Sequence, residues 1–129
     1  MQFKKILLTG GSGYIGTHTA VKLSESDFEV VLYDNLSNSN YSVLDPINKI
    51  TGKKLKFIQG DVRDYKKLVG VLLDNKIDAV IHFAGLKAVD ESVQNPLEYF
   101  DVNVSGTLNL IKAMKFTNTR TLVFSSSAT

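Results

Sequence analysis

Short apolar runs alternate along the sequence with stretches in which apolar residues recur at helical spacing. The runs predict five β-strands, at residues 5–8, 29–33, 55–58, 79–83 and 121–124. The stretches between them predict helices at residues 14–25, 42–50 and 65–73, and a last helix that begins after Asn95. Such an alternation is typical of an α/β protein with a parallel sheet, because parallel strands need long crossover connections.

The last helix is the best marked. Asn95 can cap it, Pro96 suits its first position, and Glu98 has the spacing of a capping box. Apolar residues then recur at intervals of three and four: Leu97, Phe100, Val104, Leu108 and Ile111. This face fits burial within the chain and contact with a second copy equally well. Gly106 either allows the close approach of a neighbouring helix or is simply tolerated.

Right-handed crossovers place the five strands in the order 3-2-1-4-5, the doubly wound, Rossmann-like arrangement. The order reverses between the first and fourth strands, so a ligand is expected beside the carboxyl ends of these two strands. A length of 129 residues fits one domain. We expect residues 1–129 to form a partial domain of this Rossmann-like type, truncated after the fifth strand.

A glycine-rich loop joins the first strand to its helix. Gly11, Gly13 and Gly16 match G-x-G-x-x-G, and with Gly10 in place of Gly11 the loop also matches G-x-x-G-x-x-G. Either spacing permits a tight turn, lets the backbone approach a pyrophosphate, and leaves free N–H groups at the helix N-terminus. An ordinary structural turn is the alternative, but the position between strand and helix favours a dinucleotide site.

Asp34 ends the second predicted strand. A carboxylate here would accept hydrogen bonds from ribose hydroxyls and would repel a 2′-phosphate. No Lys or Arg lies between residues 29 and 48 to offset this repulsion. The pattern therefore favours NAD over NADP, with a solvated turn acid as the alternative.

Three more strand ends would reach the same crevice. Asp61 and Val62 follow the third strand, where Asp61 could contact adenine or cap the next helix. Residues 83–87 follow the fourth strand, and Lys87 could meet cofactor oxygens or lie in solvent. The serines at 125–127 follow the fifth strand, and their hydroxyls could reach a substrate.

The composition excludes cysteine chemistry and argues against a metal site. The chain has no cysteine, which excludes disulfides, thiolate catalysis and cysteine-ligated metals. His18 and His82 are the only histidines and no acidic cluster accompanies them, so we expect no metal site. His82 ends a buried strand and is expected to be packed or hydrogen-bonded. The acids Asp90 and Glu91 are expected to face solvent.

The formal net charge is +2, and the lysines form no long basic stripe, so we expect no nucleic-acid partner. A membrane span needs about 18 apolar residues, and no apolar run approaches that length, so we expect neither a membrane span nor a signal peptide. We therefore expect no membrane partner and a cytoplasmic location.

Five segments together resemble the UDP-glucose 4-epimerases of the extended short-chain dehydrogenase/reductase group. They are TGGSGYIG at 9–16, DNLSNS at 34–39, HFAGLKAV at 82–89, NVSGT at 103–107 and FSSSAT at 124–129. The glycine loop marks only the larger group, whereas HFAGLKAV is much more specific. The resemblance implies that the C4 epimers UDP-glucose and UDP-galactose interconvert through a 4-keto sugar, with hydride held on bound NAD. It also implies a homodimer through the helices after the third and fourth strands.

The resemblance implies roles for individual residues. The N–H groups of Tyr14 and Ile15 would bind the pyrophosphate, and Ser127 would be the catalytic residue that hydrogen-bonds the sugar hydroxyl at the reacting carbon. The remaining cofactor contacts would come from Gly10, Gly13 and Gly16 in the loop; Asp34, Asn35, Leu36, Ser37, Asn38 and Ser39 at the ribose; Asp61 and Val62 at the adenine; and Phe83, Ala84, Gly85, Lys87 and Asn103 along the cofactor. Many epimerases have two adjacent asparagines where this chain has Val102 and Asn103.

Two parts of the family pattern are missing from the sequence. In the family, a Tyr-x-x-x-Lys pair beyond the fifth strand supplies the catalytic base, and a carboxy-terminal domain grips the nucleotide sugar. Tyr65 and Tyr99 do not substitute, because neither has lysine four residues later. We therefore expect the isolated chain to lack turnover.

Two alternatives fit the same glycine loop. The first is a nucleotide-sugar 4,6-dehydratase, which needs an acid and a base that related dehydratases place after the fifth strand as Asp-Glu. This chain has Ala128 and Thr129 there, which argues against that reaction. A non-catalytic NAD-binding or redox-sensing module fits if 129 residues is the natural length.

Overall fold

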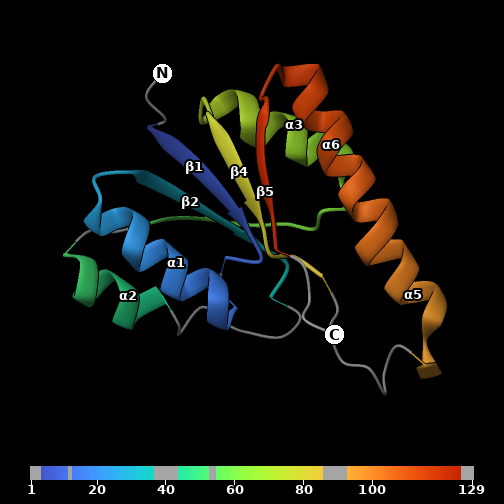
Figure 1. Cartoon of the computed structure of the whole chain (residues 1–129), viewed down its shortest axis with the longest axis horizontal. Helices are drawn as coiled ribbons and strands as arrows, with labels where there is room; N and C mark the ends of the chain where they lie inside the picture. Colours follow the sequence, from blue (N-terminus) through green and yellow to red (C-terminus); the bar gives the residue numbers. More distant parts are fainter. Residues whose placement is uncertain (1–3, 12, 37–43, 53–54, 86–92, 126–129) are drawn as a thin grey trace.

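The structure is a computed structural model that describes residues 4–11, 13–36, 44–52, 55–85 and 93–125. Within these residues, five parallel strands form one sheet in the order β3-β2-β1-β4-β5 (Figure 1). The strands are β1 (Lys5–Thr9), β2 (Glu29–Asp34), β3 (Lys56–Gln59), β4 (Ala79–His82) and β5 (Thr121–Phe124). The order is the predicted one, and each strand end lies within one residue of its expected position.

β1 occupies the centre of the sheet. Its Leu7 pairs with Val31 of β2 and with Val80 of β4. All three side chains are buried, as expected for a parallel sheet covered on both faces. β3 and β5 form the two edges.

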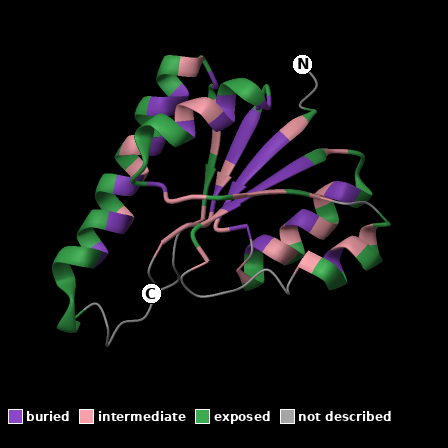
Figure 2. Ribbon diagram, turned by 180° about the vertical axis from the view of Figure 1, so that it is seen from behind, coloured by how far each residue is buried: buried purple, intermediate pink, exposed green. Residues whose placement is uncertain are grey.

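Two helices cover each face of the sheet (Figure 1). They are α1 (Tyr14–Glu25) and α2 (Leu44–Thr51) on one face, and α3 (Tyr65–Asp74) and α6 (Gly106–Thr117) on the other. Alternate residues of β1 serve the two cores: Leu8 packs with the residues under α1, and Leu7 with those under α3 and α6. Figure 2 shows buried residues along the central strands and exposed residues on the outer sides of the helices. Pro46 is the third residue of α2, the early position that its type suggests.

The predicted last helix is a continuous rod that extends past the carboxyl ends of the strands (Figure 1). It consists of α5 (Pro96–Phe100), the π-helical turn η2 (Asp101–Ser105) and α6. Pro96 begins it as expected, but the predicted capping box is wrong, because the side chain of Asn95 makes no capping hydrogen bond. The π turn was not predicted; in it, the Gly106 N–H donates to the Asp101 carbonyl oxygen, five residues earlier.

The apolar residues predicted along this rod face solvent in the chain. They form an outer apolar face that is 44% to 84% exposed: Leu97, Phe100, Val104, Leu108 and Ile111. A second apolar set on the same rod is buried instead: Tyr99, Val102, Leu110, Ala113 and Met114. Burial of the first set within the chain, one of the two predicted possibilities, is therefore wrong.

Gly106 stands where this rod comes nearest to the loop after β3. A Cβ atom there would lie 2.6 Å from Cγ2 of Val62, which is buried. The glycine therefore permits a close approach, which was one of the two predicted reasons for it. The neighbour is a loop residue, however, and not a second helix.

Candidate cofactor-binding site

Three glycines of the loop between β1 and α1 are required by the fold itself. At Gly11, a Cβ would lie 2.9 Å from the Leu8 carbonyl oxygen. Gly10 has a left-handed backbone (φ +70°), and a Cβ there would lie 2.7 Å from the amide nitrogen of Ala84. Gly16, in the first turn of α1, lies so close to the Gly10 carbonyl oxygen that a Cβ would collide with it. These contacts hold the loop between the end of β4 and the start of α1, as expected for a tight strand-to-helix turn.

Gly13 is different, because the fold does not explain it. It precedes α1 with an ordinary extended backbone (φ −74°, ψ 175°). The nearest atom that a Cβ would meet is the Gly10 carbonyl oxygen at 3.3 Å, so a small shift would accommodate a side chain. A ligand lying against this backbone would explain the glycine, because a side chain would project into the ligand's space.

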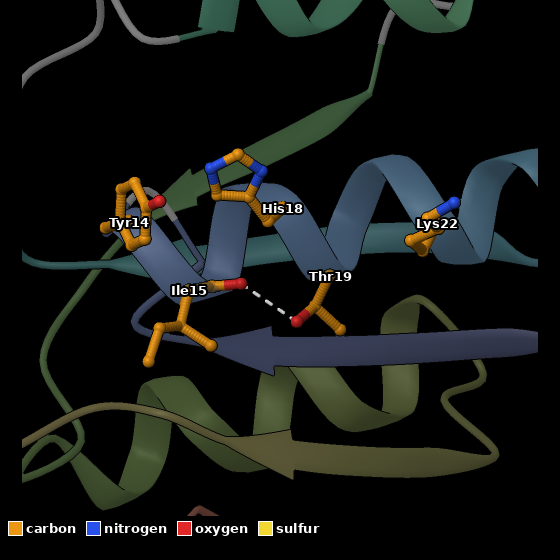
Figure 3. Close-up of a pocket in the computed structure, with 5 residues that line it drawn as sticks. All are labelled: Tyr14, Ile15, His18, Thr19 and Lys22. Carbon is orange, nitrogen blue, oxygen red and sulfur yellow. Dashed lines mark hydrogen bonds between the residues drawn. The ribbon is translucent and has the colours of Figure 1, made fainter.

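The first turn of α1 presents backbone N–H groups that have no partner within the helix. No acidic side chain lies in this turn, and Gly13 offers no side-chain cap. A shallow pocket of about 330 Å³ on the outer side of α1 is lined by Tyr14, Ile15, His18, Thr19 and Lys22 (Figure 3). The predicted pyrophosphate contacts use only the N–H groups of Tyr14 and Ile15, so their side chains can line this pocket without conflict.

Asp34 ends β2 beside the glycine loop, since the Gly10 N–H donates to the Tyr33 carbonyl oxygen (2.8 Å). Oδ1 of Asp34 accepts the Leu36 N–H (2.8 Å), and Leu36 has a left-handed backbone (φ +63°). The carboxylate therefore shapes the turn after β2. The two predicted roles of Asp34, turn acid and ribose ligand, are compatible, because a carboxylate has roughly four acceptor positions.

Asp61 is held mainly by Arg63. The guanidinium donates from Nε to Oδ1 (3.0 Å) and from Nη2 to Oδ2 (2.8 Å), and the Arg63 N–H also reaches Oδ1 (2.9 Å). Asn35 donates its Nδ2 to Oδ2 (3.2 Å). These hydrogen bonds, led by those from the Arg63 side chain, lower the pKa of Asp61 to about 2. Asp61 does not cap the next helix: Asp64 does, by accepting the Lys67 N–H (3.1 Å), so the capping alternative is wrong.

Arg63 was missed by the sequence analysis, although it connects two elements. Its Nη1 donates to Oδ2 of Asp101 in η2 (3.0 Å), and its carbonyl oxygen accepts Nδ2 of Asn109 (2.9 Å). The hydrogen bonds to Asp61 and Asp101 raise the pKa of Arg63 above its usual range. Tyr33 supports the same corner by donating its hydroxyl to the Asp61 carbonyl oxygen (2.8 Å), and burial raises the pKa of this phenol.

The segment after β4 crosses the end of β1. Phe83 donates its N–H to the Thr9 carbonyl oxygen (2.8 Å), and the Ala84 N–H reaches the Thr9 hydroxyl (3.4 Å). A Cβ on Gly85 would lie 3.1 Å from Oδ1 of Asn103 in η2. The structure therefore gathers these four predicted contact residues where the strand order reverses.

His82 is buried at the end of β4, and both nitrogens of its ring have partners. Nδ1 lies 2.5 Å from Oγ1 of Thr9, and Nε2 lies 3.0 Å from Oγ1 of Thr107. The ring also packs on Phe124 of β5, with centroids 5.7 Å apart. The prediction of a packed, hydrogen-bonded histidine is confirmed. The two threonines were missed, because no local pattern links positions 9, 82 and 107.

Some predicted site residues lie outside the described part of the chain: Ser37, Asn38, Ser39, Lys87 and Ser127. Residues 90–91, which were expected to face solvent, lie outside it too. Among the residues that are described, no three His, Asp or Glu side chains gather in a way that could hold a metal ion. None of the described helices combines the length and apolar character that crossing a membrane requires.

The doubly wound sheet, its glycine loop and the acid at the end of β2 define a Rossmann-type α/β domain with the geometry of dinucleotide-binding folds. Residues 7–129 match the family model described as GDP-mannose 4,6 dehydratase. Among named relatives, UDP-glucose 4-epimerase of Klebsiella pneumoniae is 54% identical over 125 residues, which cover 97% of this chain and 90% of the relative. UDP-glucose 4-epimerase of Neisseria meningitidis serogroup B is 52% identical over 126 residues, 98% of this chain and 37% of the relative. The chain belongs to the UDP-glucose 4-epimerase family.

Solved structures agree with this assignment. UDP-glucose-4-epimerase from Stenotrophomonas maltophila, with bound NAD and formylated UDP-arabinopyranose, matches with a TM-score of 0.95 and 46% identity. The Bifidobacterium longum enzyme, in complex with NAD+ and UDP, matches with a TM-score of 0.94 and 48% identity. The matches cover 98% and 97% of this chain but only 38% and 37% of the respective structures. The chain therefore spans little more than a third of these relatives, and nine-tenths of the Klebsiella one.

Proposed function

We propose that this chain is the NAD-binding part of a UDP-glucose 4-epimerase. The observation that carries the proposal is the position of Gly13 beside the N-terminus of α1: a Cβ there would meet only the Gly10 carbonyl oxygen, at 3.3 Å, whereas a pyrophosphate lying against this backbone would require the glycine. Relatives support the choice of cofactor, since the Stenotrophomonas and Bifidobacterium structures contain NAD. They also favour an epimerase over a 4,6-dehydratase, as does the sequence Ala128-Thr129 where related dehydratases carry an acid and a base.

The adenosine half of NAD would lie over the carboxyl ends of β2 and β3. Asp34 would accept hydrogen bonds from the ribose hydroxyls, with residues 35–39 beside it. Asp61 and Val62 would lie against the adenine. Since the carboxylate of Asp34 would repel a 2′-phosphate, the proposal includes a preference for NAD over NADP.

The other half would lie beyond β4, where Phe83, Ala84, Gly85 and Asn103 meet, with Lys87 following. The chemistry that NAD supplies when bound is the uptake and return of a hydride from C4 of the sugar. In the proposal Ser127 hydrogen-bonds the hydroxyl at this carbon. The reaction also needs a general base, and no tyrosine in these 129 residues has lysine four positions later. We therefore expect the chain to bind cofactor without interconverting UDP-glucose and UDP-galactose.

A homodimer is part of the proposal. The outer apolar face along α5, η2 and α6 is exposed in the single chain, and a second copy related by a two-fold axis would cover it. The proposal also includes a cytoplasmic location and no nucleic-acid or membrane partner, consistent with the small net charge of +2.

Calorimetric titration of the 129-residue chain with NAD and NADP tests the cofactor. We expect saturable binding of NAD and weaker binding of NADP. Equal affinity for the two would contradict the role of Asp34, and no binding of either would overturn the proposed function. An epimerase assay on the same sample, monitoring UDP-galactose formed from UDP-glucose, is expected to show no turnover.

A further inference from the structure

The buried ring of His82 belongs to a series of hydrogen bonds with one consistent direction. The Thr107 hydroxyl donates its single hydrogen to the Asn103 carbonyl oxygen (2.7 Å). Its oxygen can then only accept from His82, so the ring hydrogen lies on Nε2. In the neutral ring, Nδ1 then has no hydrogen and accepts the hydroxyl of Thr9. The Ala84 N–H completes the series by donating to the Thr9 oxygen.

This direction requires the neutral ring with its hydrogen on Nε2. A hydrogen on Nδ1 would turn the Thr9 hydroxyl from donor into acceptor, and the hydroxyl hydrogen would then need another acceptor although Thr9 is completely buried. The Thr107 hydroxyl would lose its donor at the same time. One tautomer therefore satisfies the whole series, and the other breaks it at both ends.

Both ends of the series lie at predicted cofactor contacts. Ala84 lies against Gly10 of the glycine loop, and Asn103 lies against Gly85. The series joins β1, β4, η2 and α6, all on the side of the crevice where the second half of a dinucleotide would lie. None of its five members comes from β2, β3 or the loops that follow them, where the adenosine half is proposed to bind.

We propose that His82, as the Nε2–H tautomer, is a positioning residue for the half of the cofactor that lies beyond the pyrophosphate. It acts by fixing the backbone at Ala84 and the turn that carries Asn103. This inference rests on the proposed function. It predicts that breaking the series weakens the binding of NAD but spares AMP, which occupies only the adenosine side.

The substitution Thr107→Val tests this with little change of shape, because it removes only the hydroxyl that joins His82 to Asn103. Thr117→Val is the matched control: Thr117 lies on the same helix, and its hydroxyl donates to the carbonyl oxygen four residues earlier, at Ala113 (2.9 Å). Calorimetry on the 129-residue chain should show that Thr107→Val lowers NAD affinity about tenfold with AMP affinity unchanged. Thr117→Val should change neither. A general loss of stability would weaken both ligands together and leave their ratio unaltered.

A pair of substitutions at position 82 provides the rescue. His82→Gln places an amide nitrogen near the position of Nε2, from which it can donate to Thr107, whereas His82→Phe fills the space without a donor. We expect His82→Gln to retain more of the NAD-to-AMP affinity ratio than His82→Phe. Equal ratios in these two variants would contradict a role for the Nε2 hydrogen bond.

The tautomer can be observed directly in the unliganded chain. Long-range proton–nitrogen NMR of the histidine rings should place the hydrogen of His82 on Nε2, and a hydrogen on Nδ1 would overturn the assignment. Failures of the two proposals are distinguishable. A wild-type chain that binds neither NAD nor AMP overturns the proposed function, whereas normal NAD binding with an unaltered ratio in Thr107→Val overturns only the role of His82.

Discussion

The guanidinium of Arg63 grips the carboxylate of Asp61 through two parallel hydrogen bonds, of 3.0 Å and 2.8 Å. The Arg63 N–H and the amide of Asn35 take the remaining acceptor positions. An adenine amino group that approached Asp61 would therefore compete with Asn35, whose bond of 3.2 Å is the longest of the four. The family resemblance implied that Asp61 lies at the adenine, but the sequence did not reveal that the carboxylate already has these partners.

The ion pair predicts a pH dependence of stability. Arg63 lowers the pKa of Asp61 from 3.8 to about 2, so the stabilising charge is present above pH 4 and is lost as the pH falls towards 2. Because the side chains are partly exposed, Asp61→Asn should cost only about 1 kcal/mol in the free energy of unfolding at pH 7. Urea denaturation should show this difference shrinking between pH 4 and pH 3. A difference that grows in acid would contradict the assignment.

Substitution of Gly13 should mainly affect NAD affinity, whereas substitution of Gly16 should mainly affect stability. A Cβ on Gly13 needs a shift of only a few tenths of an ångström, so Gly13→Val should lower the melting temperature less than a substitution of Gly16 does. NAD affinity should fall at least about 100-fold, because the side chain takes the space of the pyrophosphate. Gly16→Ala should destabilise the fold itself, because its Cβ collides with the Gly10 carbonyl oxygen. Calorimetry and thermal melts separate the two effects. Unchanged NAD affinity in Gly13→Val would rule out this site.

The charge of Asp34 should set the choice between NAD and NADP. Asp34→Ala is expected to reduce the preference for NAD, and it also removes the acceptor for the Leu36 N–H. Asp34→Asn is the sharper variant, because its amide oxygen can keep that turn while the negative charge is gone. We expect the ratio of the two affinities to shift about tenfold towards NADP in both variants. A ratio that stays constant in Asp34→Asn would mean that the charge does not contact the ribose.

The outer apolar face should drive self-association. Phe100→Asp places a charge within this face and should shift the chain from dimer towards monomer in sedimentation velocity. Phe116→Asp serves as the control, since Phe116 is also exposed on α6 but does not belong to this face. Equal behaviour of the two variants would argue against a dimer through this surface.

The strands and their order could be predicted because their sequences contain a strong local signal. Runs such as Ile6-Leu7-Leu8 are apolar at every position, as only a sheet covered on both faces requires. The glycine loop was equally clear, since its spacing is local. The sequence could not show that Gly10, Gly11 and Gly16 are required by the fold while Gly13 is only lightly constrained, because that distinction depends on the path of the backbone and on its neighbours.

The face of the last helix could not be chosen from periodicity. Two apolar sets run along it at similar spacing, one containing Phe100 and the other Val102. The choice between them depends on α3 and the sheet, because Leu110 packs in one core with Leu68 of α3 and Val80 of β4, both distant in the sequence. The same reason hides the partners of Arg63 and His82, which come from distant elements. Contacts of this kind become visible only once the sheet has brought those elements together.

β5 is an edge strand of the described sheet and pairs with β4 alone. Its Val123 and Phe124 are more than half exposed. Strand edges of this type are templates for backbone pairing with another chain, and such pairing can continue from chain to chain. A chain produced at high concentration would therefore be expected to form open-ended aggregates by a route that Phe100→Asp leaves untouched. Turbidity that persists in this variant, and falls when a lysine replaces Val123, would mark that second route.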